Sequence, residues 1–166
     1  PMNFADNALM FRSGNPKPCG TPAEILAQGK HFYEELSPET GEFFNTMLDN
    51  ELLDVLSTPG KRAGGYCTSL GDYHVPFIFA NFNGTQHDVE VVTHEAGHAF
   101  AAWLNRDRIP QSYIWPSLEA CEVHSMSMEF FAWPWAEGFF GEDTRKFRYS
   151  HLAVSYTHLT LPTSDL

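Results

Sequence analysis

The chain of 166 residues lacks any apolar run long enough to cross a membrane. It also lacks an excess of basic residues, because 10 Lys and Arg stand against 21 Asp and Glu, for a net charge of −11. Such a charge would be repelled by the phosphates of nucleic acids and anionic lipids. We therefore expect neither nucleic acid nor membrane as a partner. The first residues show no pattern of a signal peptide.

Cysteine is scarce, and the three that occur, Cys19, Cys67 and Cys121, are far apart with no C-x-x-C pair. This pattern does not predict a disulfide framework and favours a reducing, cytoplasmic compartment. Internal repeats and low-complexity tracts are absent too. Hydrophobic residues make up 43% and aromatic residues 14% of the chain, which is typical of a globular domain with a real core.

Helix start signals organise the first part of the chain. Thr21 and Glu24 form a capping box, which predicts a helix beginning at Thr21. Ser37 signals a second start, and apolar residues at helical spacing extend that helix as far as Val55. The Gly-rich residues 60–84 instead predict two short strands.

The second part is predicted to be mostly helical. Thr85 and Asp88 predict another capping box, which opens a helix that continues to about Arg106. Further helices are expected from about Pro116 to Trp133 and from about Asp143 onward. The predicted fold is therefore mainly α, with a small β-sheet next to the helix that begins at Thr85.

The sequence His94-Glu95-Ala96-Gly97-His98 matches the H-E-x-x-H pattern. Residues four apart share one face of a helix, so both imidazoles can reach one ion. Glu95 can approach a water on that ion without being a ligand, and can then act as general base and general acid. The pattern predicts one Zn²⁺ per chain, with His94 and His98 as ligands and Glu95 as the catalytic carboxylate.

A catalytic zinc ion needs a third protein ligand. The segment LEACEVHSMSMEFF supplies four candidates on one predicted helix: Glu119, Glu122, His124 and Glu129. The three glutamates share roughly one face, whereas His124 points away from Glu122. Helical spacing alone leaves the choice among the glutamates open.

Together with GKRAGGY and FIFANFNGT, these motifs resemble the M3 family of zinc peptidases, the group of thimet oligopeptidase and oligoendopeptidase F. The resemblance runs from about Leu36 to Leu152 and is greatest to the oligoendopeptidase F branch. ACEVHSMSMEFF matches the family pattern E-x-x-S-x-x-x-E as Glu122, Ser125 and Glu129. The resemblance implies that Glu122 is the third zinc ligand, in a zincin-type helical catalytic core.

Three further assignments concern residues around the metal. Glu129 is a candidate to accept a hydrogen bond from a ligand histidine, or else an ordinary carboxylate between helices. Ser125 is a weaker candidate for a residue that contacts one of the metal ligands. Gly64, Gly65 and Tyr66 are placed in an edge strand that could bind an extended substrate backbone, although simple turn chemistry explains them equally well.

The resemblance implies an enzyme that hydrolyses internal bonds of short peptides. The alternatives are a zinc-binding fragment without activity and an exopeptidase on a related scaffold. The run from Val154 to Thr163, VSYTHLTLPT, resembles a translated sequencing adaptor. We therefore expect residues 1–153 to be part of the catalytic domain and residues 154–166 to be a non-native tail. The resemblance implies that the residues that hold the tetrahedral intermediate lie beyond this chain.

Overall fold

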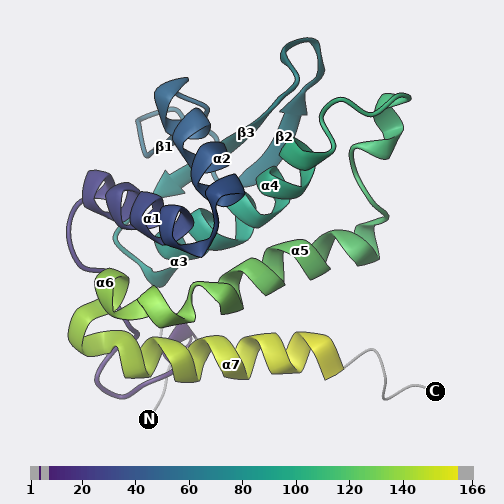
Figure 1. Cartoon of the computed structure of the whole chain (residues 1–166). Helices are drawn as coiled ribbons and strands as arrows, with labels where there is room; N and C mark the ends of the chain where they lie inside the picture. The colour runs from purple at the N-terminus through teal and green to yellow at the C-terminus, as the bar shows by residue number, and fades with distance from the viewer. Residues whose placement is uncertain (1–3, 5–7, 161–166) are drawn as a thin grey trace.

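The computed structural model describes residue 4 and residues 8–160, without the side chains of Gln111, Glu119 and residues 155–160. Helices dominate, and a small sheet lies against them (Figure 1). The elements are α1 (Pro22–Leu36), α2 (Pro38–Asp49), β1 (Leu53–Leu56), β2 (Tyr66–Leu70), β3 (Val75–Phe82), α3 (Gln86–Glu90), α4 (Ala96–Leu104), α5 (Leu118–Phe131), α6 (Ala136–Phe140) and α7 (Thr144–Thr160). The mainly α fold with one small sheet is as predicted.

The first two helices begin where the sequence predicts. Thr21 caps α1, and the side chain of Glu24 accepts from the Thr21 backbone N–H at 2.7 Å, which completes the capping box. Ser37 caps α2 in the same way, with Thr40 as its reciprocal partner. These short-range hydrogen bonds satisfy backbone groups that would otherwise lack partners at the helix ends.

Two of the local predictions are wrong. The second helix ends at Asp49 rather than Val55, and residues 53–56 form β1, where Val55 is buried. Apolar spacing in this stretch fits both structures, and pairing with β3 decides between them. Thr85 makes no side-chain capping bond, and Asp88 instead accepts from the backbone N–H groups of residues 83 and 84.

The sheet has the order β1-β3-β2, with β1 parallel and β2 antiparallel to β3. Every second residue of β3 is buried, and Ile78 is fully so. The other two strands pair with β3 on either side, so β2 lies at one edge of the described sheet. α4 packs against β2 and β3, which places the edge strand beside the helix that carries the H-E-x-x-H motif.

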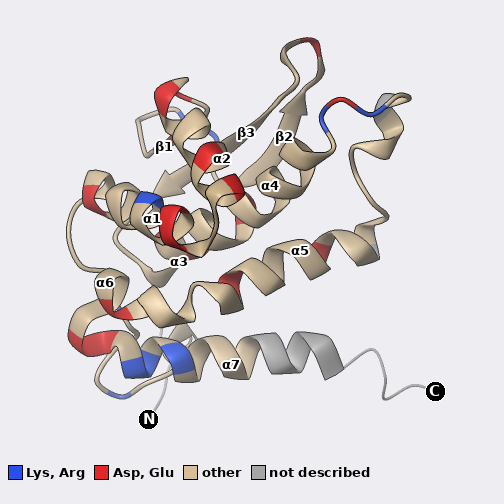
Figure 2. Ribbon diagram, viewed as in Figure 1, with Lys and Arg blue, Asp and Glu red and all other residues tan. Residues whose placement is uncertain are grey.

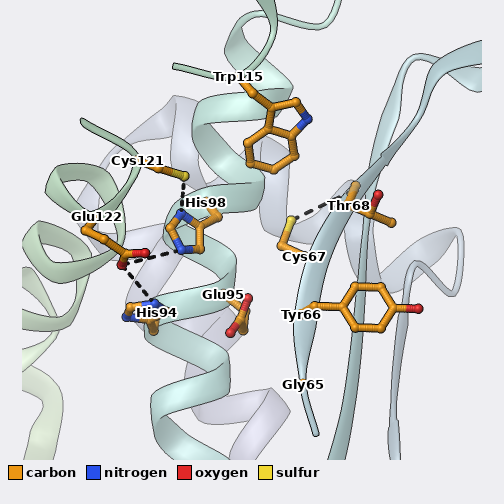
Figure 3. A pocket seen from close by; sticks show the side chains of 10 residues that line it. All are labelled: Gly65, Tyr66, Cys67, Thr68, His94, Glu95, His98, Trp115, Cys121 and Glu122. Carbon is orange, nitrogen blue, oxygen red and sulfur yellow. Dashed lines mark hydrogen bonds and ion pairs between the residues drawn. The ribbon is translucent and has the colours of Figure 1, made fainter. Parts of the chain in front are cut away.

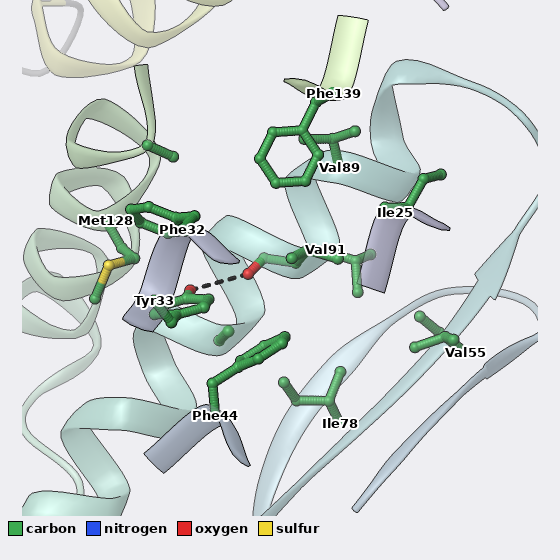
Figure 4. Packing of buried hydrophobic residues seen from close by; sticks show 14 of the residues in the cluster. Ile25, Phe32, Tyr33, Phe44, Val55, Ile78, Val89, Val91, Met128 and Phe139 are labelled. Atoms are coloured by element: carbon green, nitrogen blue, oxygen red, sulfur yellow. Dashed lines mark hydrogen bonds between the residues drawn. The ribbon is translucent and has the colours of Figure 1, made fainter. Parts of the chain in front are cut away.

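The core joins the sheet to the helices that surround it (Figure 4). Phe32 and Tyr33 of α1 are fully buried, and the Tyr33 ring stacks on Phe44 of α2 with 4.5 Å between centroids. Val89 and Val92, which precede the motif, pack into the same cluster. This burial fixes α3 and the turn that follows it against α1.

A π-helical turn, Val91–Glu95, lies between α3 and α4. It contains the first two residues of the H-E-x-x-H motif, whereas His98 lies in the regular α4. A π-helical turn replaces the usual backbone hydrogen bonds between residues four apart by bonds between residues five apart. The Tyr33 hydroxyl donates to the Val92 carbonyl at 2.9 Å, within the core (Figure 4).

Figure 1 shows α4 between the sheet and α5, with α7 running alongside α5 on the far side. The acidic residues are spread over the helices, while the start of α7 is basic (Figure 2). In the described residues, no helix is both long and apolar enough to cross a membrane. The predicted boundary after Ala153 falls within α7, and residues 161–166 lie outside the described part of the chain, so this boundary stays a prediction.

Candidate metal centre and peptidase family

Three side chains from two helices converge on one point (Figure 3). The ligand atoms of His94, His98 and Glu122 all lie within 4.8 Å of one another. The Oε2 atom of Glu122 is 3.4 Å from Nε2 of His94 and 3.8 Å from Nε2 of His98. The two imidazole rings are nearly perpendicular, with their centroids 4.9 Å apart.

This arrangement fits a zinc ion. Zinc binds imidazole nitrogen at about 2.0–2.1 Å and carboxylate oxygen at about 2.0–2.2 Å, so ligand atoms at tetrahedral angles lie about 3.4 Å apart. Two histidines and one glutamate form one of the usual ligand sets of catalytic zinc, with a fourth position left open. Among the glutamates with described side chains, Glu122 is the one whose carboxylate faces both histidines.

The opposite ring nitrogens of the two histidines have partners of their own. Nδ1 of His94 lies 2.5 Å from Oε1 of Glu129, and Nδ1 of His98 lies 3.2 Å from Sγ of Cys121. Occupied Nδ1 atoms leave the two Nε2 atoms free to face Glu122. Glu129 was one candidate for this place from the sequence, whereas the contact of Cys121 with His98 was not predicted.

The carboxylate of Glu129 is held ionised. Burial on its own would raise the pKa of Glu129, but hydrogen bonds from His151 and His94 keep that pKa at about 2. Burial also disfavours the charged form of His94, yet Glu129 raises the pKa of His94 overall. Burial, followed by the charge of His94, lowers the pKa of His98, which keeps this imidazole neutral and able to bind a metal.

Ser125 orients Glu122 within α5, and Gly97 lets the two ligand helices approach each other closely. Ser125 is completely buried, and its hydroxyl donates to Oε2 of Glu122 at 3.0 Å. Gly97 faces α5 so closely that a Cβ atom there would lie 3.0 Å from the carbonyl oxygen of His124. Glycine therefore lets α4 and α5 approach until Glu122 reaches the histidines.

Glu95 points into a cavity of about 480 Å³ between α4 and the edge strand β2 (Figure 3). Burial raises the pKa of Glu95 despite the opposing charge of His94 and a backbone hydrogen bond from Cys67. The cavity is lined by Gly65, Tyr66, Cys67, Thr68, His94, Glu95, His98, Trp115, Cys121 and Glu122. A carboxylate with a raised pKa next to a candidate metal position is suited to proton transfer.

The three residues predicted for substrate binding differ in their positions relative to the cavity. β2 begins at Tyr66, so the two glycines precede the strand rather than belonging to it. Gly65 and Tyr66 line the cavity, although the Tyr66 ring stacks on Phe79 and points away from the histidines (Figure 3). Gly64 is not among the lining residues, and its φ of +104° fits turn chemistry.

A family model for peptidase family M3 matches residues 30–148, from within α1 to the first turns of α7, which include the residues above except His151. The chain belongs to peptidase family M3. It is 30% identical over 95 residues to oligopeptidase PepF of Bacillus subtilis, and 31% identical over 114 residues to the chromosomal oligoendopeptidase F of Lactococcus lactis. These matches cover 57% and 68% of this chain.

A crystal structure of a protein assigned as an oligoendopeptidase F of Bacillus anthracis superposes with a TM-score of 0.88 at 54% identity, over 92% of this chain. The chain spans only 14% and 17% of the two curated M3 relatives and 28% of this third protein. The likeness therefore concerns a part of those longer proteins.

Sequence reasoning missed several residues that this M3 chain brings to the site, among them His151 and Trp115. His151 of α7 contacts Glu129, and Trp115 forms part of the cavity wall. Neither residue is linked to the metal ligands by a sequence motif or by helical spacing. Their places in the site follow only from the tertiary packing. The side chain of Glu119, the remaining candidate ligand, lies outside the described residues.

Proposed function

We propose that this chain is part of a zinc-dependent endopeptidase that hydrolyses internal bonds of short peptides. The observation that carries the proposal is the convergence of His94, His98 and Glu122 beside the cavity that contains Glu95. Membership of peptidase family M3 supports peptide hydrolysis, and the names of the two curated relatives support short peptides as substrates.

The ligand set and its surroundings support zinc as the metal. His94, His98 and Glu122 would hold the ion, and Glu129 and Cys121 would orient the two imidazoles from their Nδ1 atoms. A bound zinc ion would polarise a water molecule and the peptide carbonyl, and would lower the pKa of the water to about 7.

Glu95 would move the protons of the reaction. Its carboxylate takes a proton from the attacking water and then delivers one to the leaving amine. The raised pKa of Glu95 brings it closer to the pH at which both transfers are efficient. The edge strand β2, on the opposite wall of the cavity, would align the peptide backbone by hydrogen bonds.

Metal content and turnover test this proposal. Mass spectrometry of the native, dialysed chain should show about one zinc ion per chain, with none in the His94→Ala or His98→Ala variants. Glu95→Gln should retain the zinc, because Glu95 acts on the water rather than the ion. A folded chain that binds no zinc would remove the basis of the proposal.

The length of the products separates an endopeptidase from an exopeptidase. A blocked quenched fluorescent peptide should be cleaved internally by a longer protein that contains this chain, and Glu95→Gln should abolish that cleavage. Release of only one or two terminal residues from an unblocked peptide would favour the exopeptidase instead. Zinc binding without any cleavage, even in the longer protein, would favour an inert metal-binding role.

A further inference from the structure

A line of hydrogen bonds leads away from the metal centre into α7. Oε1 of Glu129 contacts Nδ1 of His94, and its Oε2 contacts Nε2 of His151. Nδ1 of His151 accepts from the indole Nε1 of Trp133 at 3.1 Å. Trp133, His151 and Glu129 thus form a connected group, which we call the α7 relay, that ends on His94.

The indole N–H of Trp133 determines which atoms donate and which accept along the α7 relay. An indole N–H can only donate, so Nδ1 of His151 must be the acceptor and its proton must lie on Nε2. Nε2 then donates to the carboxylate of Glu129, which can only accept. The other carboxylate oxygen accepts from Nδ1–H of His94, and the lone pair of His94 Nε2 is left facing Glu122.

His151 is held rigidly enough to pass on this orientation. It is buried, with 4% of its surface exposed, and its ring stacks on Phe147 with 5.4 Å between centroids. Phe130 and Trp133 contact the same ring edge-on. An imidazole enclosed by three aromatic rings can reach few alternative positions.

We propose that His151 is a positioning residue of the metal centre, which holds Glu129 and through it the orientation of His94. This inference rests on the proposed function, since it concerns the same metal. It extends the centre beyond the two ligand helices to α7, whose described side chains include no ligand of the metal.

Two substitutions of His151 test the proposal in the 166-residue chain, with zinc alone as the probe. His151→Phe keeps an aromatic ring but loses the donor to Glu129, whereas the amide of His151→Gln can still donate to it. Competition with a chromophoric chelator should show zinc binding weakened about 10-fold or more in His151→Phe, the usual cost of losing an outer partner. His151→Gln should recover most of that loss.

The chain contains a matched control. Trp135 donates to Glu35 at 2.5 Å, and Nε2 of His31 lies 3.6 Å from the same carboxylate, which makes a similar trio on exposed helix surface. His31→Phe should leave the zinc affinity unchanged. The absorption of bound Co²⁺, which depends on ligand geometry, should change in His151→Phe and not in His31→Phe.

Unchanged zinc affinity in folded His151→Phe would overturn the proposal, as would equal losses in the Phe and Gln variants. If His151→Phe does not fold, His151→Asn replaces it, because its amide is too short to reach Glu129; equal affinities of the Asn and Gln variants would then overturn the proposal. Absence of zinc from the unsubstituted chain would instead count against the proposed function.

Discussion

Gly97 on α4 faces Ser125 on α5 so closely that a Cβ atom on Gly97 would lie 2.8 Å from the Cα of Ser125. Backbone cannot move aside as a flexible side chain can, so Gly97→Ala should push α5 outward and carry Glu122 away from the histidines. We expect zinc affinity to fall about 10-fold or more, and stability to fall by about 1–3 kcal/mol. Gly138→Ala is the control, because the nearest atoms to a Cβ there belong to the flexible side chain of Gln28.

Substitutions on α5 should rank by their distance from the metal. Glu122→Ala removes a ligand and should weaken zinc binding most, whereas Glu129→Ala should cost about 10–100-fold. Ser125→Ala removes one hydrogen bond to Glu122, worth about 1 kcal/mol or about 5-fold in affinity. Isothermal titration of the three variants checks the order, and a larger loss in Glu129→Ala than in Glu122→Ala would contradict the ligand assignment.

Removal of the Tyr33 hydroxyl should destabilise the π-helical turn. Tyr33→Phe leaves the Val92 carbonyl buried without its donor, which costs about 1–3 kcal/mol. Chemical denaturation should show a loss of this size, while Tyr73→Phe, at an exposed tyrosine, should show almost none. Equal stability of the two variants would mean that the carbonyl has another partner.

Chelation should lower the melting temperature of the chain. The ligands come from helices 28 residues apart in the sequence, His94 to Glu122, so the unfolded chain has no preformed site. Free zinc at 100 times its Kd stabilises a single-site protein by about 2.7 kcal/mol, which corresponds to about 5–10 °C for a chain of this size. The shift should disappear in His98→Ala and persist in Glu95→Gln.

The pair His87 and Glu90 should make a pH-dependent contribution to α3. The hydrogen bond to Glu90 raises the pKa of His87 above its ordinary 6.5, although burial opposes this. Because the folded pKa is the higher one, the stabilisation is fully present below pH 6.5 and is lost as the pH rises through the raised value. Titration of His87 by NMR should show this pKa, and Glu90→Gln should lower it.

Local signals in the sequence predicted local structure well. The caps at Thr21 and Ser37 depend on side chains three residues away, so short sequence patterns suffice to find them. β1 was missed because Val55 satisfies helical spacing as well as strand pairing, and the strand exists only through its contact with β3. The hydrogen bonds of Asp88 were predicted wrongly because its carboxylate accepts from backbone N–H groups that precede Thr85, not from Thr85 itself.

The residues of the candidate site also fall into those that a local sequence pattern predicts and those that depend on tertiary packing. His94 and His98 could be predicted as a pair because about four residues make one helical turn. The preference for Glu122 came from the resemblance to the M3 family, since spacing alone did not separate the glutamates. His151 lies 57 residues after His94, and no sequence pattern links them. Its role depends on how α7 packs beside α5, which only the tertiary structure shows.

The π-helical turn has a consequence for how the chain tolerates changes in length. Each residue of an α-helix advances the chain by about 100° around its axis. The π-helical turn holds one residue more than an α-helical turn, so deletion of Val92 would tighten it into an ordinary α-helix with little rotation of α3. Insertion of one residue there would instead rotate α3 by about that angle relative to His94. Val89 and Asp88 would then leave their buried positions, although every letter of the H-E-x-x-H motif would be intact. The motif therefore depends on the number of residues before it as well as on its own sequence.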